Sequence, residues 1–164
     1  MKKTKKYMCF ICLLASVSWL QACTIFSAKD KNGIVWAGNN EDNLFFFKNY
    51  INIVVATDST LGYVGFSNDS PDGYMQGAVN EAGLFYDGNA VPATVYKDYD
   101  KKKSFPGGPN AMIKYALSRC KTVPEVFKLF KEYRQDGLEG GQLHFADKFG
   151  NLGIIVADSM WLTQ

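Results

Sequence analysis

The chain has 164 residues, the size of one domain, and its 47% apolar and 15% aromatic content is enough for a packed core. Its formal charge of +2 arises from a leader that holds four of the 18 basic residues and no acid, so the remainder carries 14 basic and 16 acidic side chains. This composition excludes a disordered chain. The slightly acidic remainder gives no electrostatic basis for binding nucleic acid.

Residues 1–22 have the pattern of an export signal. Four lysines lie within the first six residues, residues 7–19 form an apolar stretch, and Ala22 is the small residue that signal peptidase needs before its cut. The apolar stretch is shorter than the ~20 residues that span a bilayer, which argues against a permanent transmembrane helix. We therefore expect a secreted or periplasmic protein with one domain, residues 23–164, that begins at Cys23.

Cys23 allows two opposed interpretations. A cysteine at a new N-terminus carries a thiol and an α-amine with a pKa of about 7.7–8.0, so one residue can supply both the nucleophile and its base. Alternatively, residues 20–23 resemble a bacterial lipobox, and acylation of both groups would leave a membrane-anchored lipoprotein with a binding or structural role. The leader alone slightly favours the lipoprotein, whereas the residues after Cys23 favour the nucleophile.

The pattern after Cys23 predicts strands, then two helices, then strands, which is the order of an α+β layered domain. Polar clusters at 38–43 and 87–92 follow predicted strands, where loops commonly carry functional residues. The predicted strands are 24–28, 34–37, 52–57, 63–66, 74–79, 84–86, 143–146 and 152–156.

Two helices are expected between residues 110 and 137. Asn110 is predicted to cap a helix over 111–120, and Thr122 with Glu125 has the spacing of a capping box for a second helix that Gly137 can end. Cys120 falls on the apolar face of the first helix, so it is expected to be a small buried residue rather than the partner of Cys23 in a disulfide. No spacing typical of metal ligands or of a phosphate-binding loop is present.

Three kinds of residue are candidates for an active site with Cys23. Asp42 follows one complete hairpin, which brings it near Cys23, where a carboxylate would orient the α-ammonium; an isolated loop acid is the ordinary alternative. The amide of Asn89 could donate to a developing oxyanion, although alone it is more often a turn residue. The aromatic run Phe45, Phe46 and Phe47 favours core packing over an acyl pocket by about two to one. His144, among apolar neighbours on a strand, is expected to be structural.

Four motifs in order resemble one known family. They are Cys23-Thr24, Gly38-Asn39-Asn40-Glu41-Asp42, the stretch Asn80–Leu84 with Asp87–Pro92, and Leu143–Asn151. Together they are similar to the N-terminal nucleophile hydrolases, in particular the choloylglycine hydrolase and penicillin V acylase group of linear amide C–N hydrolases.

The resemblance implies a fold and a reaction. The fold would be the N-terminal part of a four-layer αββα sandwich. The reaction would be hydrolysis of a small-molecule amide through a thioester, with Cys23 as nucleophile, Asp42 holding its amine, Asn89 in the oxyanion hole and no cofactor. Acyltransferases of the isopenicillin N type share the same beginning and are the close alternative.

Two departures from the family pattern stand out. Asn39 occupies a position that is commonly arginine, which removes a fixed positive charge, so specificity for bile salts or penicillins does not follow. Family members also continue past the last hairpin and take a second oxyanion asparagine and a further arginine from that half. From this pattern we expect the sequence to be a truncated form. The aromatic residues Phe45 to Phe47, and Asn39 beside the nucleophile, are then the expected substrate-binding residues.

Overall fold

The computed structural model describes residues 23–42, 46–97 and 99–163. It confirms a mixed, sheet-rich architecture with two α-helices. The strands are β1 (Thr24–Lys29), β2 (Val35–Asn40), β3 (Asn49–Val54), β4 (Tyr63–Asn68), β5 (Met75–Asn80), β6 (Phe85–Ala90), β7 (Lys103–Ser104), β8 (Tyr133–Arg134), β9 (Gly141–Ala146), β10 (Leu152–Val156) and β11 (Ser159–Thr163). The helices are η2 (Tyr99–Lys101), α2 (Gly108–Arg119) and α3 (Val123–Glu132).

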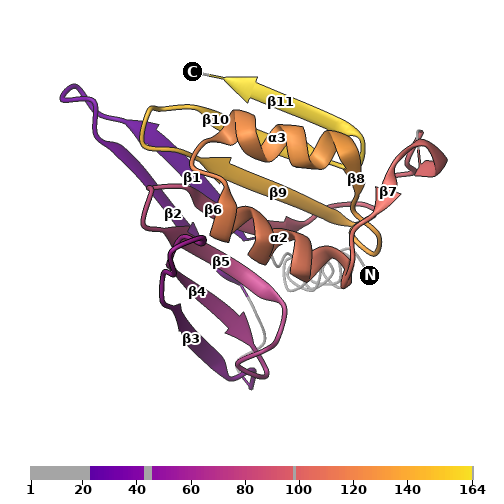
Figure 1. Cartoon of the computed structure of the whole chain (residues 1–164), viewed down its shortest axis with the longest axis horizontal. Coiled ribbons are helices and arrows are strands. Elements are labelled where there is room, and N and C mark those ends of the chain that lie inside the picture. The colour runs from indigo at the N-terminus through magenta and orange to yellow at the C-terminus, as the bar shows by residue number, and fades with distance from the viewer. Residues whose placement is uncertain (1–22, 43–45, 98, 164) are drawn as a thin grey trace, which may run out of the picture.

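Seven strands form one antiparallel sheet in the order β11-β10-β9-β6-β5-β4-β3 (Figure 1). The chain builds the sheet from β3 to β6, leaves it for the two helices, and returns at β9 beside β6. Side chains in β4 alternate between buried and exposed, as expected for a strand with one covered face. The pairing of β6 with β9 therefore joins segments on either side of the helical excursion.

Helices α2 and α3 cover one face of this sheet (Figure 1). Their apolar faces pack on Tyr86 and Phe145, which are inaccessible to solvent. The predicted capping box is confirmed, because the Thr122 hydroxyl accepts from the backbone N–H of Glu125 and the Glu125 carboxylate accepts from that of Thr122. This core fixes the sheet on which the candidate site lies.

The hairpin of β1 and β2 lies on the opposite face. Leu143 and Phe145 of β9 point into the helix-covered core, so His144 between them points to the other face. There its Nε2 lies 3.0 Å from the Ser27 hydroxyl of β1. His144 is thus a structural link between the hairpin and the sheet, as expected from the sequence, and burial lowers its pKa.

Several predicted strand boundaries are wrong for one physical reason. β2 extends through Asn40 and β6 through Ala90, so residues placed in polar loops are in fact paired: Asn40 with Thr24, and Asn89 with Gln142. A polar side chain on one face of a strand does not prevent its backbone from pairing. The strand predicted at 52–57 lies at 49–54, and β7, β8 and β11 were not predicted.

Two predicted helix boundaries are also wrong. Gly107, not Asn110, is the N-cap of α2; the Asn110 side chain instead accepts from the backbone N–H of Met75 at 3.0 Å. Helix α3 ends at Glu132 rather than at Gly137, because Tyr133 turns extended and starts β8, which pairs with β7. Gly137 lies in the connection to β9.

Among the described residues, we find no helix with the length and apolar character needed to cross a membrane.

The contact of α3 with β10 gives a test of this packing. A Cβ added at Gly153 would collide with Val123 and lie 2.8 Å from a ring carbon of Phe127. Because these side chains are held in a packed core, we expect Gly153→Ala to lower the free energy of unfolding by about 1–3 kcal/mol in chemical denaturation. Val123→Ala in the same chain removes one colliding group and should recover part of the loss. Strictly additive effects would contradict the proposed contact.

Candidate active site

Cys23 lies at a cavity of about 470 Å³ between the start of β1 and the adjoining ends of β6 and β9. Asp42 and Asn89, which the sequence predicted to lie near Cys23, line the same cavity. Tyr74, Gln76 and Gln142 are among the other residues around it. The fold therefore brings together three candidates that are separated by up to 66 positions in the chain.

The Cys23 thiol is half-buried and donates to Oε2 of Glu41 at 3.3 Å. Burial raises its pKa, and the carboxylates of Glu41 and Asp42 act in the same direction. A hydrogen bond from the Asp42 backbone opposes this shift. With its nitrogen in the peptide bond to Ala22, Cys23 is therefore a protonated thiol near neutral pH, and activation requires a base.

Asn89 is on β6 and is one of the residues that line the cavity. Its Nδ2 makes a long bond of 3.4 Å to the carbonyl of Ala90, and its Oδ1 is buried with no hydrogen-bond partner among the described residues. Such a weakly engaged amide can donate to a new oxygen in the cavity. Asp42, which also lines the cavity, is exposed and lies directly after the hairpin.

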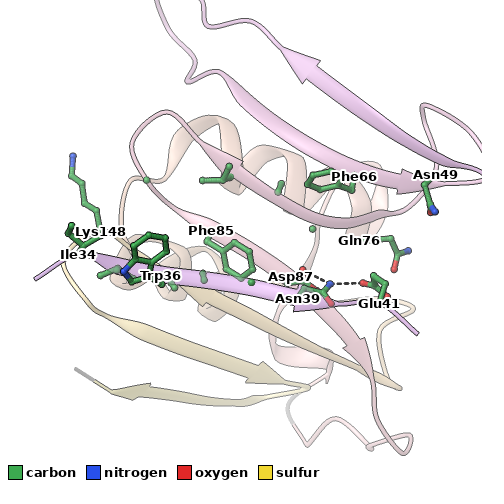
Figure 2. A pocket seen from close by; sticks show the side chains of 18 of the residues that line it. Ile34, Trp36, Asn39, Glu41, Asn49, Phe66, Gln76, Phe85, Asp87 and Lys148 are labelled. Carbon is green, nitrogen blue, oxygen red and sulfur yellow. Dashed lines mark hydrogen bonds between the residues drawn. The ribbon is translucent and has the colours of Figure 1, made fainter. Parts of the chain in front are cut away.

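A larger cavity of about 890 Å³ adjoins the first, and Glu41 and Gln76 line both. Apolar side chains from two layers form most of it, among them Trp36 of β2 and Phe66 of β4 (Figure 2). Figure 2 shows Ile34, Trp36 and Lys148 toward one end and the polar group of Asn39, Glu41 and Asp87 toward the other. The polar end is the one nearer Cys23, because Glu41 contacts its thiol.

Asn39 joins two carboxylates at this polar end. Its Nδ2 donates to Oε1 of Glu41 and to Oδ2 of Asp87, both at 2.7 Å (Figure 2). Asp87 is only 2% exposed. Burial raises its pKa to about 7; the Asn39 hydrogen bond lowers it and the charge of Glu41 raises it further. Asp87 therefore holds a proton over much of the acidic and neutral range.

Glu41 and Asp87 were not among the sequence candidates, although signals for both were present. Glu41 directly precedes Asp42 in the polar cluster that follows the first hairpin. Asp87 is two residues before Asn89, so the two side chains lie on the same face of β6. Had the predicted strand been extended to Ala90, the alternation of side chains between its two faces would have placed Asp87 beside Asn89.

The structure places the remaining candidates elsewhere. Phe45 lies outside the described residues, while Phe46 is 62% exposed and its ring lies 5.0 Å from that of Phe47. Neither Phe46 nor Phe47 lines the two cavities described above, so their substrate contact stays a prediction. Cys120 is buried with a free thiol, as expected, and burial raises its pKa to about 11.

Within the described ranges, no group of three or more histidine, cysteine, aspartate or glutamate side chains is arranged to hold a metal ion.

The described architecture is shared with part of the fold of longer solved structures. The chain matches the structure of penicillin V acylase from Agrobacterium tumefaciens with a TM-score of 0.64 and 19% identity, over 87% of this chain and 49% of that one. It also matches a variant of conjugated bile acid hydrolase from Clostridium perfringens with a TM-score of 0.59 and 14% identity, over 86% and 50% respectively. The resemblance inferred from the motifs is confirmed at the level of fold.

The chain spans about half the length of the solved structures it matches. No protein-family model matches the sequence, and comparison with curated protein sequences gives no match.

The buried Asp87 predicts an unusual dependence of stability on pH. Its native carboxyl keeps a proton up to a pKa of about 7, whereas the unfolded group loses it near 3.8. The native state thus binds more protons between these values, and Asp87 makes stability fall as pH rises, by up to about 1.4 kcal/mol per pH unit. Asp87→Asn should remove this contribution in urea denaturation between pH 5 and 8. Asp58→Asn, at an exposed acid in the turn after β3, should leave the profile parallel to wild type. Parallel profiles for both variants would refute the prediction.

Proposed function

We propose that the mature protein hydrolyses a linear carbon–nitrogen amide bond with Cys23 as an N-terminal nucleophile. The observation that supports this most directly is the single cavity lined by Cys23, Asp42 and Asn89. Its fold gives independent support, since the two structural neighbours are named as an acylase and a conjugate hydrolase. The complete four-layer αββα arrangement belongs to the same proposal.

The proposed reaction has two steps. The α-amine of Cys23, freed by cleavage after Ala22, takes the thiol proton, and the sulfur attacks the amide carbonyl carbon. The C–N bond breaks, the amine leaves with that proton, and a thioester forms. Water then attacks the thioester, which releases a carboxylic acid and restores the thiol.

Two side chains have assigned roles in these steps. Asp42 holds the α-ammonium, because a nearby carboxylate favours the charged amine and fixes its orientation. Asn89 donates its amide to the oxyanion that develops as sulfur attacks. Neither residue takes up a proton from the substrate in this scheme.

The proposed substrate is a small molecule with an acyl group, and the proposed location is outside the cytoplasm, as the leader predicts. The larger cavity beside Cys23 offers apolar walls to an acyl chain. Asn39, bonded to Glu41 and Asp87 at the polar end of this cavity, is a proposed substrate-binding residue. The aromatic residues Phe45 to Phe47 are proposed as further substrate-binding residues from the sequence pattern.

Cys23→Ser tests the nucleophile. We expect loss of at least about 100-fold in amidase rate, because a hydroxyl is a far weaker nucleophile than a thiolate near neutral pH. Intact-mass spectrometry of the exported wild type should show an unmodified N-terminus at Cys23. A lipidated Cys23, or full amidase activity in Cys23→Ser, would contradict the proposal. Cys120→Ala, at a buried thiol away from the cavity, is the matched control.

Phe46→Ala and Phe47→Ala test the proposed acyl contacts. If these rings hold an acyl chain, KM for long-chain amides should rise by about three- to tenfold, with little change for short-chain amides, because the lost contact is apolar area. Phe149→Ala removes another exposed ring, in the turn after β9, and should change neither value. Equal effects on short and long chains would assign the two rings to packing instead.

A further inference from the structure

Glu41 lies where the two cavities meet and uses both carboxylate oxygens at the site. Oε2 accepts from the Cys23 thiol at 3.3 Å, and Oε1 accepts from Nδ2 of Asn39 at 2.7 Å. The side chain is otherwise exposed, and an exposed glutamate samples several rotamers. Two partners on opposite oxygens hold it in one orientation.

The hydrogen-bonded line continues into the sheet. Asn39 also donates to Oδ2 of the buried Asp87 at 2.7 Å, so Cys23, Glu41, Asn39 and Asp87 are joined in sequence. Cys23 directly precedes β1, Asn39 lies near the end of β2, Glu41 directly follows β2, and Asp87 lies in the middle of β6. These hydrogen bonds thus link the exposed carboxylate of Glu41, through Asn39, to the buried Asp87 of the main sheet.

A glycine leaves the space that Asp87 occupies. Gly77 is the partner of Asp87 in the pairing of β5 with β6, and a Cβ there would lie 2.6 Å from Oδ2. Any larger residue at position 77 would displace the carboxyl that anchors Asn39. The glycine therefore leaves room for the buried acid that bonds to Asn39 and, through it, supports Glu41.

We propose that Glu41 is a positioning residue that holds the Cys23 sulfur in place, and that Asn39 and Asp87 hold Glu41. The inference rests on the proposed function in taking Cys23 as the nucleophile. Before cleavage after Ala22, the negative charge of Glu41 also keeps the thiol protonated. After cleavage, the new α-ammonium places a positive charge beside Glu41 and Asp42 and offsets them.

The surrounding groups agree with this electrostatic role. No lysine, arginine or histidine is among the described residues that line the Cys23 cavity. Tyr74, before β5, and Tyr86, of β6, have pKa values raised by burial and are neutral near pH 7. The described titratable groups that line this cavity with Cys23 are Glu41, Asp42 and Tyr74. Behind them, Asp87 of β6 accepts from Asn39, Tyr86 of β6 lies in the helix-covered core with its hydroxyl 3.4 Å from that of Tyr74, and His144 of β9 contacts Ser27 of β1.

The test measures thiol reactivity and needs no turnover. The full chain, with its Ala22–Cys23 bond intact, is treated with iodoacetamide between pH 6 and 10, and alkylation of Cys23 is followed by peptide mass spectrometry. Glu41→Gln should shift the pH midpoint downward and speed alkylation at pH 7.5 by about threefold or more, because a nearby like charge is removed. Glu41→Asp keeps the charge but shortens the side chain by one methylene, so its profile should lie between those of wild type and Glu41→Gln.

Two further variants test the line behind Glu41. Asn39→Ala and Asp87→Asn should give profiles between those of wild type and Glu41→Gln, since the charge remains but is no longer held. Glu81→Gln removes an exposed charge in the turn between β5 and β6 and should leave the profile unchanged. Circular dichroism on each variant separates these effects from unfolding.

The outcomes distinguish this inference from the proposed function. A Glu41→Gln profile that coincides with wild type in a folded protein overturns the role of Glu41. If the alkylation profile of Asn39→Ala coincides with that of wild type, the proposed support of Glu41 by Asn39 and Asp87 is wrong. Retained amidase activity in Cys23→Ser overturns the proposed function, whatever the alkylation profiles show.

Discussion

The attachment of the β1–β2 hairpin to the open face of the main sheet is the contact on which the candidate site depends. Among the described residues, side-chain hydrogen bonds that join the layers include Ser27 with His144 and Asn39 with Asp87. The first fixes β1 over β9, and the second fixes the end of β2 over β6. Cys23 and Asp42 lie at the two chain ends of this hairpin, so both reach the Asn89 cavity only while the hairpin is seated.

Attaching the hairpin through Asp87 lowers the stability of the folded state, because it requires a buried carboxyl group. Burying a charged carboxylate is unfavourable, so burial favours the protonated form of Asp87 and raises its pKa to about 7. An apolar residue there would pack more cheaply but could not accept from Asn39. Buried polar groups that lower stability and fix one arrangement are common at functional sites, where positioning matters more than stability.

The sequence predicted the order of strands and helices well because periodicity and capping are local signals. The Thr122–Glu125 capping box and the buried face with Cys120 follow from spacing alone. Some errors arose where pairing partners are distant: β6 extends through Ala90 because β9, some 50 residues later, continues beside it. Others are local, since β2 extends through Asn40 beside β1 of the same hairpin. Asp42 was predicted from its place after the first hairpin and Asn89 from its place at a strand end, whereas Glu41 and Asp87 needed the register of β2 and β6 to show that Asn39 contacts both.

On the face of the sheet that carries the hairpin, the strands β3 and β4 differ from β6 and β9. On β3 and β4, Ile51, Ile53, Val64 and Phe66 point away from the helices and remain exposed. The hairpin covers the sheet over β6 and β9 and leaves these side chains exposed, although Phe66 lines the larger cavity together with Trp36 of the hairpin. Every residue of the Cys23–Glu41–Asn39–Asp87 line comes from β1, β2, β6 or the segment after β2. The geometry at the thiol is therefore set by contacts within the described residues, even though the apolar face beyond it is open.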